Sequence, residues 1–160
     1  MDDSWSLPDM RESDLPTVAG LVAFALRPGD TVTLAGALGA GKTTFARALI
    51  RSLLGDAGAE VPSPTFSLVQ SYDTPRMPVA HADLYRLAED ADLTELGLDD
   101  ALAVGAVLIE WPERAASRLP SERLAIRFAE TTNADARTLT FDASGEWRAR
   151  LARLVSIHAL

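Results

Sequence analysis

The sequence contains no cysteine, a single lysine and no long apolar run. Without cysteine the chain forms neither disulfides nor thiolate metal sites. A membrane-spanning helix needs about 20 apolar residues in succession, and no segment approaches that length. Residues 1–10 are acidic and polar, unlike a secretory signal. We therefore expect a cytoplasmic protein without a membrane partner.

The net charge and the length of the chain bear on RNA binding and on the number of domains. Lys and Arg together number 15 against 23 Asp and Glu, a formal net charge of −8. Direct binding of nucleic acid depends on clustered basic side chains at the phosphates, so this acidic chain is a poor candidate for binding RNA by itself. Its 160 residues and 48% apolar content predict a single domain, residues 1–160, with a substantial hydrophobic core.

The single lysine, Lys42, lies in a glycine-rich loop, whereas the other fourteen basic side chains are arginines. Residues 36–43 read GALGAGKT and match the phosphate-binding pattern G-x-x-x-x-G-K-[ST]. In this pattern glycines let backbone N–H groups approach the phosphates, the lysine reaches the β- and γ-phosphates, and the hydroxyl of Thr43 is placed to bind Mg²⁺. The candidate nucleotide contacts are Gly36, Leu38, Gly39, Ala40, Gly41, Lys42, Thr43 and Thr44.

The segments beside the loop have the periodicity that the motif requires. Residues 31–35 are rich in β-formers, and residues 42–54 carry apolar side chains at helical spacing. Further strands are expected at residues 5–8, 66–72, 79–84, 106–109, 124–128 and 138–141, and helices at residues 15–26, 87–96, 99–104 and after 144. A strand–loop–helix unit followed by several strands predicts the α/β class, as a P-loop NTPase-like three-layer domain with a central mixed β-sheet.

Two carboxylates follow apolar runs of strand character. Asp83 follows residues 79–82, and Glu110 follows residues 106–109. A phosphate-loop site needs such a carboxylate to hold Mg²⁺ or to orient the attacking water, and either residue is a candidate. His81 alternates within the same strand as Asp83, so we interpret it as structural.

Two further observations concern the γ-phosphate and the base. Thr65 lies in a proline-bracketed loop, about twenty residues after the phosphate loop, where a γ-phosphate-sensing switch would lie. Guanine is usually recognised through N-K-x-D, but the sole asparagine, Asn133, precedes alanine, and no lysine besides Lys42 is present. We therefore expect ATP rather than GTP, with Mg²⁺ as the metal.

Five segments in order resemble the successive motifs of the TsaE family, formerly called YjeE. They read GALGAGKTTFARAL, SPTFSLVQSY, HADLYRL, ELGLDD and LIEWPER, and the resemblance covers about residues 7–130. Members of this family are bacterial ATPases for the threonylcarbamoyladenosine modification of tRNA. The resemblance implies an ATPase that is weak alone, that acts with TsaB- and TsaD-type proteins, and that meets tRNA only through their complex.

The resemblance also implies roles for individual residues. Thr43 and Glu110 are the Mg²⁺ ligands, and the Asp83 carboxylate acts on water or metal. Thr65 belongs to a switch-like loop and, with Lys42, to the catalytic residues.

Two more positions follow from the same resemblance. Trp111 follows the metal carboxylate, where it packs by the nucleotide or by a partner. Ala37 departs from the family pattern, because many members carry an acidic residue there, so any role of that acid toward water or a partner is in doubt.

Two other functions stay open. A small-molecule kinase of the P-loop class would need a lid and an arginine-rich acceptor pocket, but the arginines are scattered along the chain and no lid insertion is evident. A nucleotide-sensing regulatory module would depend on ATP binding rather than turnover, and the sequence separates it poorly from an ATPase.

Overall fold

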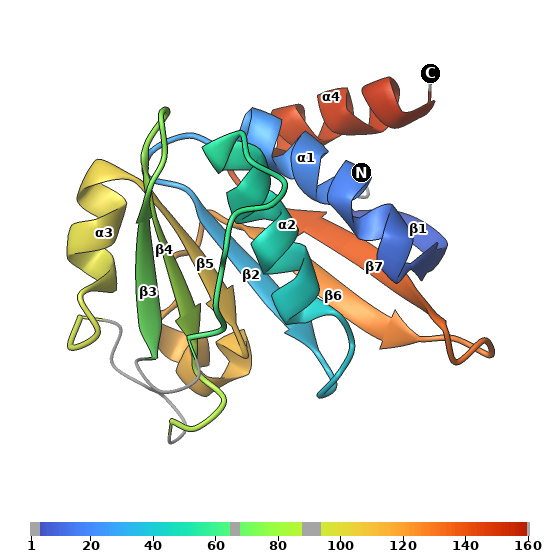
Figure 1. Cartoon of the computed structure of the whole chain (residues 1–160), viewed down its shortest axis with the longest axis horizontal. Coiled ribbons are helices and arrows are strands. Elements are labelled where there is room, and N and C mark those ends of the chain that lie inside the picture. Colours follow the sequence, from blue (N-terminus) through green and yellow to red (C-terminus); the bar gives the residue numbers. More distant parts are fainter. Residues whose placement is uncertain (1–3, 65–67, 88–93, 160) are drawn as a thin grey trace.

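The computed structural model describes residues 4–64, 68–87 and 94–159. Its strands form one seven-stranded sheet in the order β1-β7-β6-β2-β5-β4-β3 (Figure 1). The strands are β1 (Ser4–Arg11), β2 (Thr31–Gly36), β3 (Val69–Asp73), β4 (Pro78–Asp83), β5 (Ala106–Glu110), β6 (Leu124–Glu130) and β7 (Ala136–Ala143). The helices are α1 (Leu15–Ala25), α2 (Lys42–Leu54), α3 (Leu98–Val104) and α4 (Trp147–Ala159), with 3₁₀ turns η1 (Glu12–Asp14) and η2 (Pro112–Arg118).

The centre of the sheet is parallel and its margins are antiparallel. Strand β2 runs parallel to both neighbours, β5 and β6, and β4 runs parallel to β5. Strand β3 pairs antiparallel with β4, and β7 pairs antiparallel with both β6 and β1. The carboxyl ends of the parallel strands β2, β5 and β4 therefore lie on the same side of the sheet, and open α/β sheets bind ligands just outside these ends.

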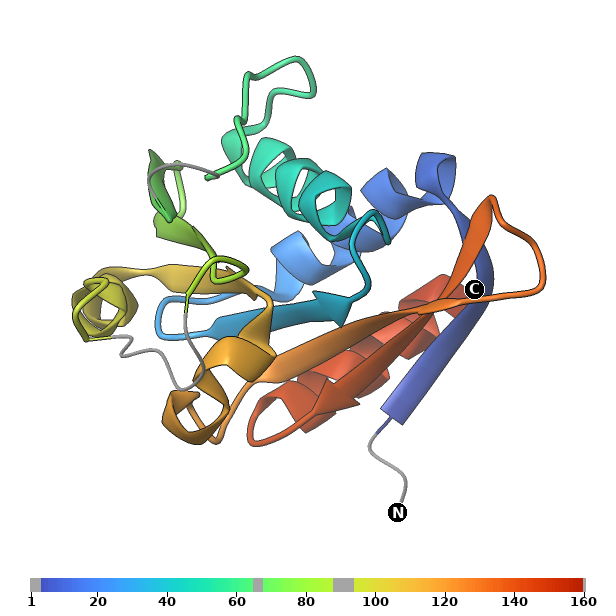
Figure 2. The ribbon, with the colours of Figure 1, turned by 90° about the horizontal axis from the view of Figure 1, so that it is seen from below.

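Helices cover both faces of the sheet and make two cores. Helices α1 and α2 lie on one face (Figure 2), where they bury Leu34 and Leu108. On the other face Ile109 packs with Leu98 of α3 and Ala115 of η2. Adjacent residues of β5 thus enter opposite cores, as alternation along a strand requires. This arrangement confirms the α/β prediction of a three-layer domain with a central mixed sheet.

Helix α2 forms as its periodicity predicts. Its buried side chains recur every three or four positions, and the apolar ones join the core that contains Leu34 and Leu108. The buried side chains are Lys42, Phe45, Ala46, Leu49, Ile50 and Leu53. The helix ends at Gly55, whose φ of 69° gives the left-handed cap common at helix C-termini.

Some element boundaries differ from the sequence prediction. Strand β1 spans Ser4–Arg11 rather than residues 5–8, because it pairs along most of its length with β7. Most of the acidic segment predicted at residues 87–96, and the start of the strand predicted at 66–72, lie outside the described residues. The turn η2 was not expected from the sequence. Within the described residues, the longest helices are too short or too polar to span a bilayer.

Candidate functional site

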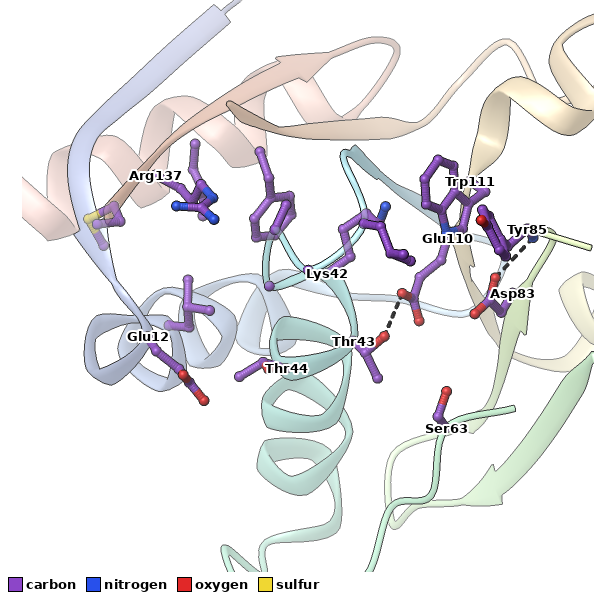
Figure 3. A pocket seen from close by; sticks show the side chains of 18 of the residues that line it. Glu12, Lys42, Thr43, Thr44, Ser63, Asp83, Tyr85, Glu110, Trp111 and Arg137 are labelled. Atoms are coloured by element: carbon purple, nitrogen blue, oxygen red, sulfur yellow. Dashed lines mark hydrogen bonds between the residues drawn. The ribbon is translucent and has the colours of Figure 1, made fainter. Parts of the chain in front are cut away.

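A cavity of about 840 Å³ opens where β2, β4 and β5 end (Figure 3). Asp83 is the last residue of β4 and Glu110 the last residue of β5. The predicted site residues that line the cavity are Leu38, Gly39, Ala40, Gly41, Lys42, Thr43, Thr44, Asp83, Glu110 and Trp111. Gly36, the last residue of β2, is not part of the lining, and Thr65 lies outside the described residues.

Two glycines of the loop are required by its geometry. Gly41 precedes α2 with a φ of 107°, a backbone conformation that residues other than glycine rarely adopt. A Cβ atom on Gly36 would lie 2.7 Å from the carbonyl oxygen of Phe128 on the neighbouring strand β6. These residues let the chain reverse tightly into α2, so that the N-terminus of α2, its electropositive end, faces the cavity.

Lys42 is held inside the loop rather than in solvent. Its side chain is 4% exposed, and Nζ donates hydrogen bonds to the carbonyl oxygens of Gly36 and, at 3.4 Å, of Ala37. Nζ also lies 3.4 Å from the ring centroid of Trp111. Burial lowers the pKa of Lys42, and the negative charge of Glu110 opposes this shift. The ammonium group is thus placed at the cavity with partners that an anionic phosphate can replace.

Trp111 turns back over the cavity immediately after β5. Its φ of 59° and ψ of 53° are left-handed, which is unusual for a bulky residue and often accompanies a functional site. Its ring stacks on Tyr85, with 4.7 Å between the centroids. Together Trp111, Tyr85 and Lys42 form one wall of the cavity (Figure 3).

Glu110 is a buried carboxylate with a donor on each oxygen. It is 1% exposed; Oε1 accepts a hydrogen bond from the hydroxyl of Thr43 at 2.8 Å. Oε2 lies 2.6 Å from Nε2 of His81, which is fully buried. The structure therefore brings together the two residues that the sequence predicted as metal ligands. It adds His81, which the sequence analysis treated as structural; its position two residues before Asp83, on the same face of β4, is the signal that could have identified it.

Asp83 lies beside Glu110 in the parallel pair of β4 and β5. Its Oδ1 accepts a hydrogen bond from the backbone N–H of Tyr85 at 3.0 Å. Burial raises the pKa of Asp83, and the nearby negative charge of Glu110 raises it further, while the Tyr85 backbone N–H opposes the shift. Asp83 is therefore a half-buried carboxylate with an increased tendency to hold a proton, at the mouth of the same cavity.

The oxygen atoms of Thr43 and Glu110 fit the requirements of Mg²⁺. This ion prefers oxygen ligands and usually takes only one or two from the protein, with phosphate and water completing the shell. Among the described residues no group of three or more His, Cys, Asp or Glu side chains is arranged to hold a metal. The Thr43 hydroxyl donates its hydrogen to Glu110, which leaves its lone pairs available to an ion.

The raised pKa of Asp83 leads to a stability prediction. In the folded chain the Asp83 carboxyl holds its proton more tightly than in the unfolded chain, where its pKa is near 3.8. The free energy of unfolding therefore falls as the pH rises from 3.8 to the raised pKa. Asp83→Asn removes this unfavourable ionisation. We expect the nucleotide-free variant to melt about 1–2 °C higher at pH 7.

Thermal unfolding followed by circular dichroism between pH 4 and pH 8 measures this effect. The gain should be complete above the raised pKa and should shrink as the pH falls toward 3.8. Asp73→Asn, a change at the exposed end of the edge strand β3, is the matched control. A variant of Asp83 that is less stable than the parent at pH 7 would contradict the assignment of burial as the cause of the shift.

The sheet order and the phosphate loop define a P-loop NTPase-like protein. Residues 10–139 match the family model described as "Threonylcarbamoyl adenosine biosynthesis protein TsaE". The chain belongs to the TsaE family, whose name refers to the biosynthesis of threonylcarbamoyladenosine.

Relatives extend the match over most of the chain. The tRNA threonylcarbamoyladenosine biosynthesis protein TsaE of Bacillus subtilis is 37% identical over 142 residues, which cover 88% of this chain and 87% of that protein. Its namesake from Rickettsia felis is 43% identical over 102 residues, 64% of this chain and 59% of that protein, so the match spans less than two thirds of its length. The crystal structure of Bacillus subtilis YdiB superposes with a TM-score of 0.81 at 31% identity, covering 100% of this chain and 99% of that chain.

Proposed function

We propose that the chain binds ATP with Mg²⁺ and hydrolyses ATP in support of the threonylcarbamoyladenosine modification of tRNA next to the anticodon. It acts in the cytoplasm with TsaB- and TsaD-type proteins and meets tRNA only through them. The observation that carries the proposal is the contact between Thr43 and Glu110, beside Lys42 of the phosphate loop, in a chain of the TsaE family. Membership of the family links this site to tRNA modification.

The phosphates of ATP lie along the loop in this proposal. Backbone N–H groups of residues 38–44 and the N-terminus of α2 bind the phosphate oxygens. Lys42 exchanges its contacts with the Gly36 and Ala37 carbonyls for the β- and γ-phosphates. Because the lysine starts inside the loop, little side-chain ordering remains to be achieved on binding.

The two carboxylates near the γ-phosphate have different roles, since Glu110 binds the metal and Asp83 orients the water. Thr43 and Glu110 hold Mg²⁺, which neutralises charge on the phosphates when it is bound. Asp83, whose backbone neighbour Tyr85 fixes one of its oxygens, orients the attacking water with the other. Thr65 is proposed to sense the γ-phosphate.

The base occupies the far end of the cavity. The cavity is also lined by Met10, Glu12 and Arg137. Of these, Glu12 and Arg137 lie on the opposite side of the phosphate loop from Glu110 (Figure 3). We place adenine there, because the distance from the catalytic carboxylates leaves room for the ribose and the phosphates between them. The cavity lining includes two exposed side chains, Leu38 at 74% and Tyr85 at 44% exposure, which are candidate contacts for a partner protein.

Steady-state hydrolysis of ATP by the purified chain tests the proposal. The chain alone should turn ATP over slowly, and TsaB- and TsaD-type proteins from the same organism, with tRNA, should raise the rate about tenfold or more. Omission of each partner in turn is the control.

Two results would favour the other functions. Phosphorylation of a metabolite, with no response to the partners, would support a small-molecule kinase. ATP binding that alters the partners' activity while hydrolysis is absent would support a regulatory module.

A further inference from the structure

We propose that His81 is a positioning residue that fixes the Glu110 carboxylate in the orientation required for Mg²⁺. The inference rests on the proposed function, because it assigns Glu110 to the metal. Its basis is the chain of contacts from the ring of His81 to Oε2 of Glu110 and from Oε1 of Glu110 to the hydroxyl of Thr43.

A buried carboxylate needs a donor for each of its oxygens. Thr43 supplies one donor, but this residue belongs to the loop that receives the nucleotide, so its hydroxyl also has to serve the ion. His81 supplies the other at 2.6 Å and lies on a different element, the strand β4. Without it, Oε2 has no partner and the carboxylate can rotate away from Thr43.

The ring of His81 is well placed to act as a fixed reference. Its strand lies inside the sheet, with Gln70 of β3 opposite it on one side and Leu108 of β5 on the other. Its side chain is completely buried. Because the ring is buried within the sheet, it holds the Glu110 carboxylate in a fixed orientation.

The histidine also has a feature that packing alone does not explain. Its Nδ1 atom is buried and has no hydrogen-bond partner among the described residues. An apolar side chain would fill the same position between Ala80 and Ala82 without leaving a nitrogen unpaired. The contact of Nε2 with Glu110 supplies a reason for a polar ring at this position.

His81 acts through Glu110 and not on the nucleotide. It is fully buried and is not among the residues that line the cavity. Loss of a hydrogen-bond partner behind a metal ligand typically costs about ten- to a hundredfold in metal affinity. The expected defect is therefore in the dependence on Mg²⁺, with the metal-free interaction of the nucleotide with the loop preserved.

Titration of a fluorescent ATP analogue at a series of Mg²⁺ concentrations tests the inference without measuring turnover. Mg²⁺ is expected to strengthen binding of the analogue. In His81→Leu, the Mg²⁺ concentration that gives half of this increase in affinity should be about tenfold higher or more. Its affinity for the analogue in EDTA should stay within about twofold of the parent. His81→Gln keeps a donor near the position of Nε2 and should restore the Mg²⁺ dependence to within about threefold.

The matched control is Thr31→Val. Thr31 is buried in the same sheet, and its hydroxyl has no partner among the described residues. It is the first residue of β2 and pairs with Val107, so it lies at the opposite end of the strand from the site. The variant should leave the Mg²⁺ dependence unchanged. If His81→Leu fails to fold, as judged by circular dichroism, His81→Asn replaces it, because the shorter amide cannot reach Glu110 as glutamine can.

The outcomes separate this inference from the proposed function. Unchanged Mg²⁺ dependence in folded His81→Leu, or equal losses with and without Mg²⁺, would overturn the positioning role. A defect in His81→Gln as large as that in His81→Leu would also overturn it. If the parent chain binds the analogue no more tightly with Mg²⁺ than in EDTA, the proposed function itself fails.

Discussion

Replacement of Lys42 by alanine is expected to weaken ATP binding by about a hundredfold and to abolish measurable hydrolysis. Lys42 is the chain's single lysine, and its ammonium group lies at the cavity in contact with the Gly36 and Ala37 carbonyls and the Trp111 ring. An anionic phosphate replaces these neutral partners with a much stronger charge-assisted contact. The variant loses that contact and keeps the rest of the loop.

Two comparisons make this prediction specific to the charge. Lys42→Met retains most of the apolar contact with Trp111 but has no charge, so it should be as defective as the alanine variant. Arg51→Ala, on the same helix but bonded to the Ala59 carbonyl, should bind ATP like the parent. Fluorescence titration and a phosphate-release assay measure both properties. Undiminished affinity and turnover in Lys42→Ala would remove the basis of the assignment.

Replacement of Glu110 by alanine is expected to eliminate Mg²⁺-dependent hydrolysis, with a loss of about a thousandfold. The change removes the carboxylate that contacts both Thr43 and His81, and it leaves their donors without a partner. Glu110→Gln keeps the shape and one oxygen acceptor but has no charge. It should fold like the parent and still lose the dependence on Mg²⁺.

Asp83→Ala distinguishes the role of Asp83 from that of Glu110. In our assignment it slows hydrolysis because water is no longer oriented, but ATP binding still tightens with Mg²⁺, since Thr43 and Glu110 remain. Parallel titrations with Mg²⁺ and in EDTA distinguish the two variants. If only Asp83→Ala lost the response to Mg²⁺, Asp83 would be the metal ligand and our assignment would be wrong.

The parts of the site that depend on local sequence could be predicted. The loop at residues 36–43 needs only glycines, Lys42 and the start of a helix, all within a short segment. Strand β5 is a short apolar run ending at Glu110, and the structure buries each of its residues. Periodicity and a motif identify such features because the interactions that form them are close in the sequence.

Features that depend on strand order could not be derived in the same way. His81 meets Glu110, 29 residues later, only because β4 and β5 are neighbours in the sheet. The pairing of β1 with β7 joins Ser6 to Thr140, which extends β1 beyond its apolar pattern. The left-handed backbone of Trp111 likewise has no local signal, because tertiary contacts with Tyr85 and Lys42 accompany it.

Calorimetric titration of the chain with ATP and, separately, with GTP, each in the presence of Mg²⁺, tests the central claim most directly. We predict one nucleotide site per chain, tighter binding of ATP than of GTP, and loss of the ATP signal in Lys42→Ala. A chain that binds neither nucleotide, or that binds GTP as tightly as ATP, would contradict an ATP site in this cavity.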